Sequence, residues 1–214
     1  MTSKLKKLLI GAATLALTAG AALAETVIIG HFGSPTPMQV ARAEGKFDAA
    51  TGWTIEWRQF GSGTEVIAAM ASGDVQVAEL GSSPLAIGTS QGLEIQLFMI
   101  AQGLGTAESL IAKAGSGITR IEDLKGKRIA VPVGSTAHYS LMGALTYAGI
   151  AETDVTIMNL PADQIAAAWD SGQVDAAFIW EPVQNQILQT GTFIVGADQT
   201  AAWGFPTFDG WVVN

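Results

Sequence analysis

Short runs with the apolar patterns of β-strands alternate with helical patterns along most of this chain, and this alternation constrains the fold more than any other feature. The strand-like runs lie at residues 27–32, 53–60, 75–80, 128–133, 155–160 and 174–179. Helical patterns lie between them, near Met38–Ala49 and from Thr136 to Tyr147 among others. Strands that alternate with helices of this length form parallel sheets covered on both faces. We therefore expect an α/β fold.

The first 24 residues stand apart from this alternation. A basic start at Lys4–Lys7 precedes an apolar run at residues 8–23, and Ala22–Ala24 matches the small-x-small cleavage pattern. This arrangement is typical of a secretory signal peptide. The apolar run is too short for a retained membrane anchor. We expect residues 1–24 to be removed and the mature chain to begin at Glu25.

The composition excludes several classes of function. The chain holds 11 Lys and Arg against 19 Asp and Glu, and three of the basic residues lie in the signal peptide. Because nucleic-acid binding needs basic patches, we expect no nucleic-acid partner. Cysteine is absent, so disulfides and thiolate metal sites are excluded. The two histidines, His31 and His138, are too few for the usual zinc site, and we expect no metal and no cofactor.

The segment Leu80-Gly81-Ser82-Ser83-Pro84 is the first candidate binding site. It follows a strand-like run and precedes a short apolar segment, so it is typical of a strand that turns into a helix. Ser83 is expected at the N-cap and Pro84 at the first helical position. Free N–H groups and the positive end of the helix dipole at such a turn suit an anion. The alternative is that the serines merely cap a helix.

A second turn of the same kind occurs at Gly134-Ser135-Thr136. It also follows a strand and begins a helix, with His138 in the first helical turn. Ligands collect at this edge of open α/β sheets, so the two turns together are suited to hold one anionic group. A histidine at a helix start is expected to be neutral. Two ordinary capped helices explain the same residues equally well.

Three further residues are candidates for holding a cation. Trp180 and Glu181 end a strand, and Asp209 lies between Phe208 and Trp211. An aromatic face contributes about 0.5–2 kcal/mol to the binding of an ammonium group. The position of Asp209 favours a functional role for it, because an acid among apolar residues needs a partner. Glu181 is better explained as a surface acid at a helix start.

Catalysis is the competing class of function. Ser82, Ser83 or Ser135 together with His138 would suit an extracytoplasmic serine hydrolase. None of these serines lies in a G-x-S-x-G elbow, however, and the required order of acid and histidine is not matched. The chain also lacks the G-x-x-x-x-G-K-[ST] loop of ATP-hydrolysing subunits. We expect a protein that is not an enzyme.

Several segments resemble the aliphatic-sulfonate, nitrate and taurine branch of periplasmic solute-binding proteins. The matching segments are Trp57–Phe60, Ala71–Gln76, Leu80–Leu85, Glu122–Pro132, Thr136–Leu141, Trp203-Gly204, Pro206-Thr207 and Asp209–Val213. The His138-Tyr139-Ser140 turn and the Asp209 segment are more specific to the taurine type. The resemblance covers nearly the whole mature chain.

This resemblance implies a type II periplasmic binding protein, with two α/β lobes that close over the ligand about a hinge. The first lobe is expected at residues 25–103 and the second at 104–203, with 204–214 crossing back to the first. In the family a C-terminal portion completes the first lobe, so we expect that lobe to be incomplete here.

The resemblance also implies a function. The protein would bind taurine in the periplasm and deliver it, as a monomer, to the permease of an ABC importer. The expected sulfonate-binding residues are Ser82, Ser83, Ser135, Thr136 and His138, and the expected ammonium-binding residues are Asp209, Trp180 and Glu181. Other aliphatic sulfonates, nitrate or a thiamine precursor are the alternative ligands.

Overall fold

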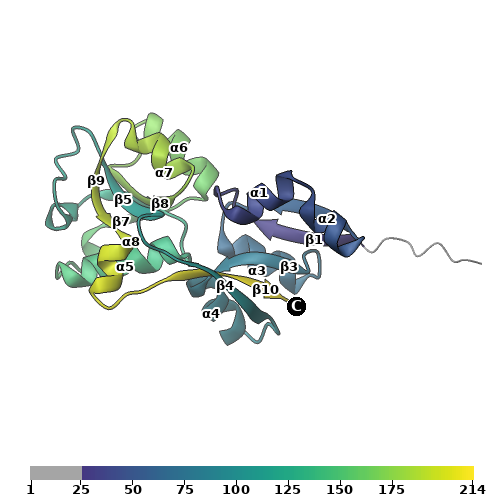
Figure 1. The fold of residues 1–214 in the computed structure, drawn as a ribbon. Coiled ribbons are helices and arrows are strands. Elements are labelled where there is room, and N and C mark those ends of the chain that lie inside the picture. The colour runs from purple at the N-terminus through teal and green to yellow at the C-terminus, as the bar shows by residue number, and fades with distance from the viewer. Residues whose placement is uncertain (1–25) are drawn as a thin grey trace, which may run out of the picture.

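Residues 26–214 of the computed structural model form two five-stranded sheets flanked by eight α-helices (Figure 1). The predicted signal peptide lies outside these described residues. Among residues 26–214, no helix has both the length and the apolar character needed to cross a membrane.

Sheet A has the strand order β2-β1-β3-β10-β4. Its strands are β1 (Thr26–His31), β2 (Thr54–Gln59), β3 (Val77–Gly81), β4 (Gln96–Gly103) and β10 (Phe208–Val213). The helices that belong with it are α1 (Pro37–Ala43), α2 (Lys46–Thr51), α3 (Gly63–Ala71) and α4 (Ser82–Ser90). Strand β10 comes from the end of the chain and lies between β3 and β4, so sheet A joins segments far apart in sequence.

Sheet B has the strand order β7-β6-β8-β5-β9. Its strands are β5 (Glu108–Lys113), β6 (Arg128–Val131), β7 (Thr156–Asn159), β8 (Ala176–Trp180) and β9 (Gly191–Gly196). Its helices are α5 (Thr136–Tyr147), α6 (Ala162–Asp170), α7 (Val183–Leu188) and α8 (Ala197–Ala202). Short 3₁₀ turns occupy Ile121–Leu124 and Glu152–Asp154.

The α/β class is confirmed, but the expectation of parallel sheets was wrong. Strand β10 is antiparallel to β3 and β4, and β5 is antiparallel to β8 and β9. Both sheets are therefore mixed. The alternation of strands and helices describes only the parallel units around β1 and β6, because strands that join a sheet from a distant part of the chain leave no such local pattern.

The helical pattern at Met38–Ala49 was also interpreted wrongly as one helix. The structure has two, α1 and α2, separated at Gly45. Gly45 has φ of 65°, a left-handed conformation that interrupts a right-handed helix and that glycine adopts without strain.

The hydrophobic core of sheet B has two clusters. One contains Leu141 and Phe178, and the other contains Trp169 and Ile179. Because side chains of one strand point to opposite faces, Phe178 and Ile179 place these clusters on the two sides of the sheet. Sheet A has a smaller cluster around Val66 and Leu80.

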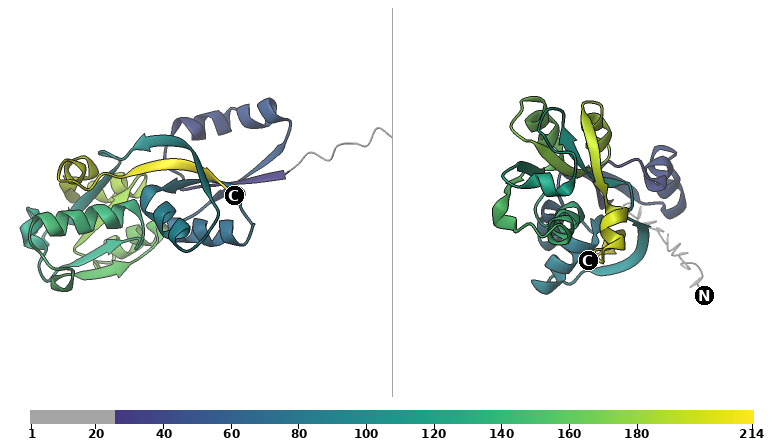
Figure 2. Two further views of the ribbon diagram at one scale, coloured as in Figure 1. Left: turned by 90° about the horizontal axis from the view of Figure 1, so that it is seen from below. Right: turned by 90° about the vertical axis from the view of Figure 1, so that its left-hand side faces the viewer.

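Strands β4 and β10 connect the two sheets. They pair antiparallel, and the left view in Figure 2 shows them running side by side from sheet A toward sheet B. On β4, Phe98 and Ile100 are 58% and 64% exposed, so this edge of sheet A is uncovered within the described residues. The lobe boundaries at 103/104 and 203/204 stay predictions.

Candidate functional site

The first candidate turn begins a helix, but not at the predicted residue. The N-cap of α4 is Gly81 and the helix starts at Ser82, so Ser83 and Pro84 are its second and third residues. The Ser82 hydroxyl is used elsewhere, because it accepts a hydrogen bond of 3.3 Å from the Phe208 N–H of β10. The expectation that Ser83 is the N-cap and Pro84 the first helical residue was therefore wrong, because the helix begins two residues earlier.

The second candidate turn caps its helix as predicted. Ser135 is the N-cap of α5, and its hydroxyl accepts a 3.1 Å hydrogen bond from the His138 N–H. The His138 Nδ1 accepts a long hydrogen bond of 3.4 Å from the Gly134 N–H. Burial lowers the pKa of His138, against an opposing effect of Glu152, so the imidazole is neutral near pH 7 as expected.

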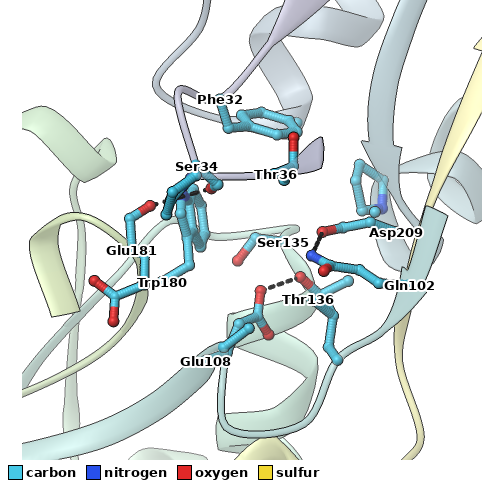
Figure 3. A pocket seen from close by; sticks show the side chains of 16 residues that line it. Phe32, Ser34, Thr36, Gln102, Glu108, Ser135, Thr136, Trp180, Glu181 and Asp209 are labelled. Carbon is cyan, nitrogen blue, oxygen red and sulfur yellow. Dashed lines mark hydrogen bonds between the residues drawn. The ribbon is translucent and has the colours of Figure 1, made fainter. Parts of the chain in front are cut away.

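A pocket lies between elements of the two sheets (Figure 3). The residues that line it are Phe32, Ser34, Pro35, Thr36, Gly63, Gly81, Pro84, Gln102, Leu104, Ala107, Glu108, Ser135, Thr136, Trp180, Glu181 and Asp209. Five of the predicted site residues are in this set, namely Ser135, Thr136, Trp180, Glu181 and Asp209. The residues labelled in Figure 3 come from the loop after β1, from β4, β5, the start of α5, the end of β8 and β10, so both sheets contribute.

Three helix starts meet at this pocket. Gly63 is the first residue of α3, Gly81 and Pro84 belong to the first turn of α4, and Ser135 and Thr136 begin α5. The N–H groups at a helix start lack intrahelical partners, and the helix dipole places partial positive charge there. This side of the pocket therefore favours an anionic group.

Gly81, the last residue of β3, lies close to the start of α5. A Cβ atom at Gly81 would lie 2.7 Å from Thr136 Cγ2 and 3.4 Å from Asp209 Oδ1. The first distance is shorter than real Cβ contacts allow. Glycine is required here because Thr136 approaches the backbone of β3 so closely.

Carboxylates lie in the same pocket, beside the helix starts. Asp209 of β10 accepts a 3.3 Å hydrogen bond from the Gln102 amide, and Glu108 of β5 accepts a 2.5 Å hydrogen bond from the Thr136 hydroxyl. Burial, reinforced by the charge of Asp209, raises the pKa of Glu108 to about 8. Burial also raises the pKa of Asp209 to about 6, against the opposing hydrogen bond from Gln102. None of the lining residues is Lys or Arg, so neither acid has a cationic partner within the lining.

A third buried acid, Glu79, lies behind Asp209. Glu79 is 2% exposed and does not line the pocket. Burial, followed by the charge of Asp209, raises its pKa to about 7, while a hydrogen bond from the Phe32 backbone N–H opposes the rise. Asp209 and Glu108 in the pocket wall, and Glu79 near Asp209, are thus acids whose ionised forms are unfavourable without a cation.

Aromatic rings and a short loop close the remaining wall. The rings of Phe32 and Trp180 are 5.9 Å apart between centroids and meet edge to face at 65°. The Ser34 hydroxyl donates a 3.1 Å hydrogen bond to the Glu181 carbonyl, which joins the loop after β1 to the end of β8. The Glu181 carboxylate accepts a hydrogen bond of 3.2 Å from the Asn185 N–H of α7. It therefore lies at a helix start, as the sequence predicted for a surface acid.

The other predicted residues line a second, adjoining cavity. Ser82, Ser83 and His138 are found there, and Ser135 lines both cavities. The structure therefore brings Ser135, Thr136 and Asp209 together and leaves the side chains of Ser82, Ser83 and His138 on the neighbouring side of the two helix starts.

The geometry does not assemble the machinery of a serine hydrolase. The Ser135 hydroxyl is bonded to the His138 backbone, and within residues 26–214 no hydrogen bond joins that hydroxyl to the His138 imidazole. A nucleophilic serine needs a base within hydrogen-bond reach. The described part of the chain also contains no cluster of three or more His, Cys, Asp or Glu side chains that could hold a metal ion.

Sequence reasoning missed Glu108, Gln102, Phe32 and Thr36 as pocket residues. Glu108 precedes an apolar run, and an acid in that position has no local signal that distinguishes it from a surface residue. Its burial depends on the pairing of β5 with β8, in which Glu108 lies opposite Trp180, 72 positions away. Gln102 owes its position to pairing with Asp209.

The relatives found by comparison with known proteins are named as binding proteins. A family model described as NMT1/THI5 like matches residues 34–213. The taurine-binding periplasmic protein of Escherichia coli K12 is 44% identical over 202 residues, which are 94% of this chain and 62% of that protein. A putative aliphatic sulfonates-binding protein of Bacillus subtilis 168 is 31% identical over 72% of this chain and 47% of the relative. These relatives are named as binding proteins, not enzymes.

The fold has a matching solved structure. The alkanesulfonate-binding protein SsuA from Xanthomonas axonopodis pv. citri, bound to MOPS, superposes with a TM-score of 0.81 over 91% of this chain and 67% of that structure, at 23% identity. This similarity confirms the periplasmic-binding-protein fold. The chain spans 62% of the length of the Escherichia coli relative and 47% of the Bacillus subtilis one.

Proposed function

The chain belongs to the NMT1/THI5-like family, and we propose that it is a solute-binding protein of an ABC importer that captures taurine in the periplasm. The pocket carries this proposal: its wall contains both helix starts that favour an anion and buried acids that need a cation. Taurine carries both charges on a two-carbon link. The names of the relatives support the same class of ligand.

The sulfonate is held at the starts of α4 and α5. Ser135 and Thr136 lie on the pocket wall, and Ser82 and Ser83 contribute backbone N–H groups from the first turn of α4. A hydrogen bond to a charged group contributes roughly 1.5–3 kcal/mol, so a few of them reach the roughly 8 kcal/mol of micromolar binding. His138, in the adjoining cavity, assists as a neutral group.

The ammonium group is held by Asp209. The ring of Trp180 and residue Glu181 complete the lining of that binding site. The loaded protein, a monomer, then delivers taurine to the membrane permease. Residues 25–103 and 204–214 form one lobe of the closing pair, and 104–203 form the other.

Calorimetric titration of the purified protein with taurine, ethanesulfonate and nitrate tests this proposal. We expect taurine to bind most tightly. Heat with ethanesulfonate or nitrate but none with taurine would refute the taurine assignment and favour a binder of simple anions.

The variant Asp209→Asn sharpens the test. The amide keeps the shape of the carboxyl group and can still bond to Gln102, but it carries no charge. We expect taurine affinity to fall by at least about tenfold, while ethanesulfonate, which has no ammonium group, binds as before. An equal loss for both ligands would show that Asp209 does not contact the ammonium group.

A further inference from the structure

A direct contact between the parts of the chain around the two sheets lies outside the pocket, at the start of α6. Ala162, the first residue of α6, donates a backbone hydrogen bond of 3.1 Å to the carbonyl of Gly61. Gly61 lies between β2 and α3, beside sheet A, whereas α6 packs on sheet B through residues such as Ile165. Neither Gly61 nor Ala162 lines the pocket. The contact therefore joins the two halves of the molecule at a place where it does not touch a ligand.

Helix α6 has no side-chain acceptor of its own at its start. Its N-cap is Pro161, which makes no side-chain capping bond, and the first N–H groups of a helix lack intrahelical partners. The Gly61 carbonyl supplies an acceptor for Ala162 from the other half of the molecule. When the halves separate, both groups bond to water instead. The hydrogen bond therefore stabilises only the arrangement in which the two halves are in contact.

The residues around Gly61 fix the position of its carbonyl. The Gly61 N–H donates a 3.0 Å hydrogen bond to the Glu65 carboxylate, and the Ser62 hydroxyl accepts one of 3.3 Å from the Glu65 N–H, so the loop is held to the first turn of α3. A Cβ atom at Gly61 would lie 3.1 Å from Pro161 Cβ and 3.2 Å from Asp163 Oδ1. Both distances are tighter than ordinary contacts. The absence of a side chain at Gly61 thus allows α6 to come this close.

A second contact joins the same two halves at the pocket itself. The Ser34 hydroxyl donates its hydrogen bond to the Glu181 carbonyl, and the rings of Phe32 and Trp180 meet edge to face (Figure 3). The loops that follow β1 and β2 therefore both reach across from sheet A to elements of sheet B. A ligand between the sheets cannot leave until such contacts open.

We infer that the hydrogen bond between Gly61 and Ala162 is a latch that holds the two halves together over a bound ligand and slows its release. The latch touches no ligand, so it acts equally on every ligand that the closed pocket holds. It is lost when the halves separate, so it changes the rate of dissociation more than the rate of association. This inference rests on the proposed function.

The variant Ala162→Pro tests the latch directly. Proline has no N–H and is tolerated at the first position of a helix. The preceding residue, Pro161, has ψ of 156°, the extended conformation that a residue before proline prefers. Helix α6 should therefore form as before, while the bond is lost and the new ring meets the Gly61 carbonyl. Ala162→Ser keeps the N–H on a small residue and is the matched control.

Stopped-flow fluorescence measures the rates for taurine and for ethanesulfonate, with the pocket residue Trp180 among the reporting tryptophans. We expect Ala162→Pro to raise the dissociation rate at least about tenfold, by the same factor for both ligands. The association rate should change by less than about threefold. Ala162→Ser should keep the wild-type rates, and the urea midpoints of both variants should match the wild type.

A second variant, Gly61→Ala, reaches the latch from the other side. Its Cβ pushes against Pro161 and Asp163 only when the halves are in contact, so dissociation should become about three- to tenfold faster for both ligands. This variant leaves α6 unchanged. It decides the matter even if Ala162→Pro does not fold.

The outcomes separate the latch from the proposed function. Wild-type dissociation rates in the two latch variants, or a faster release of only one ligand, overturn the latch and leave the proposed function standing. A wild type that binds ethanesulfonate but not taurine overturns the proposed capture of taurine, and the ethanesulfonate rates then decide on the latch. Binding of neither ligand overturns both, because a latch needs a ligand to retain.

Discussion

The buried acid Glu79 should make this protein less stable as the pH rises, and replacing it should remove part of that loss. Its pKa is about 7 in the folded protein against 4.5 for an ordinary glutamate. Between these values the folded state holds a proton that the unfolded state has released. Stability therefore falls as the pH rises, because the folded state binds more protons there.

The size of the effect follows from the two pKa values. Each pH unit between 4.5 and about 7 costs about 1.4 kcal/mol of the free energy of unfolding, which sets an upper value of roughly 3 kcal/mol. In Glu79→Gln this contribution is absent, and the amide oxygen can still accept the hydrogen bond from the Phe32 N–H. The variant should match the wild type near pH 4 and exceed it by about 2–3 kcal/mol above pH 7.

Urea unfolding at several pH values between about 4 and 8 measures this difference. The exposed substitution Glu94→Gln serves as the matched control and should follow the wild-type curve at every pH. A gap between Glu79→Gln and the wild type that stays constant with pH, or that closes as the pH rises, would refute the reasoning. Either result would mean that Glu79 is not a buried acid with a raised pKa.

Two further substitutions test the local geometry of the pocket. Gly81→Ala should abolish taurine binding and lower the melting temperature, because the new Cβ would lie 2.7 Å from the buried Thr136 side chain; calorimetry measures the first effect and a thermal melt the second. Ser135→Ala should destabilise the protein by about 1 kcal/mol through loss of the α5 cap, whereas Ser83→Ala, which removes no cap, should cost far less. Equal urea midpoints for the two serine variants would contradict the assignment of Ser135 as the cap.

Features set by neighbouring residues were predictable from the sequence. The N-cap of α5 at Ser135 depends only on the residues that follow it, and the functional interest of Asp209 followed from an acid placed among apolar neighbours. The strands of the parallel units were found for the same reason, since period and length are local properties.

Features set by long-range pairing were not predictable. The start of α4 contacts a strand at residues 208–213, because the Ser82 hydroxyl accepts a hydrogen bond from Phe208, a partner 126 positions away. The mixed character of both sheets has the same origin, as does the burial of Glu108 opposite Trp180. The local sequence around an acid that precedes an apolar run is the same whether the side chain is exposed to solvent or lines a pocket.

The same long-range pairing brings together the groups that would discriminate between ligands in the proposed function. Thr136 links its two ends, because it begins α5, where an anion is favoured, and its hydroxyl bonds to Glu108, where a cation is required. Thr136 packs close to Gly81 at the end of β3, and Asp209 of β10 also lies near Gly81. A ligand with only a negative charge satisfies the helix starts but leaves Glu108 and Asp209 without a cation. A zwitterion with a short link satisfies both ends, so selectivity for taurine over simple sulfonates should come from the acids and not from the helix starts.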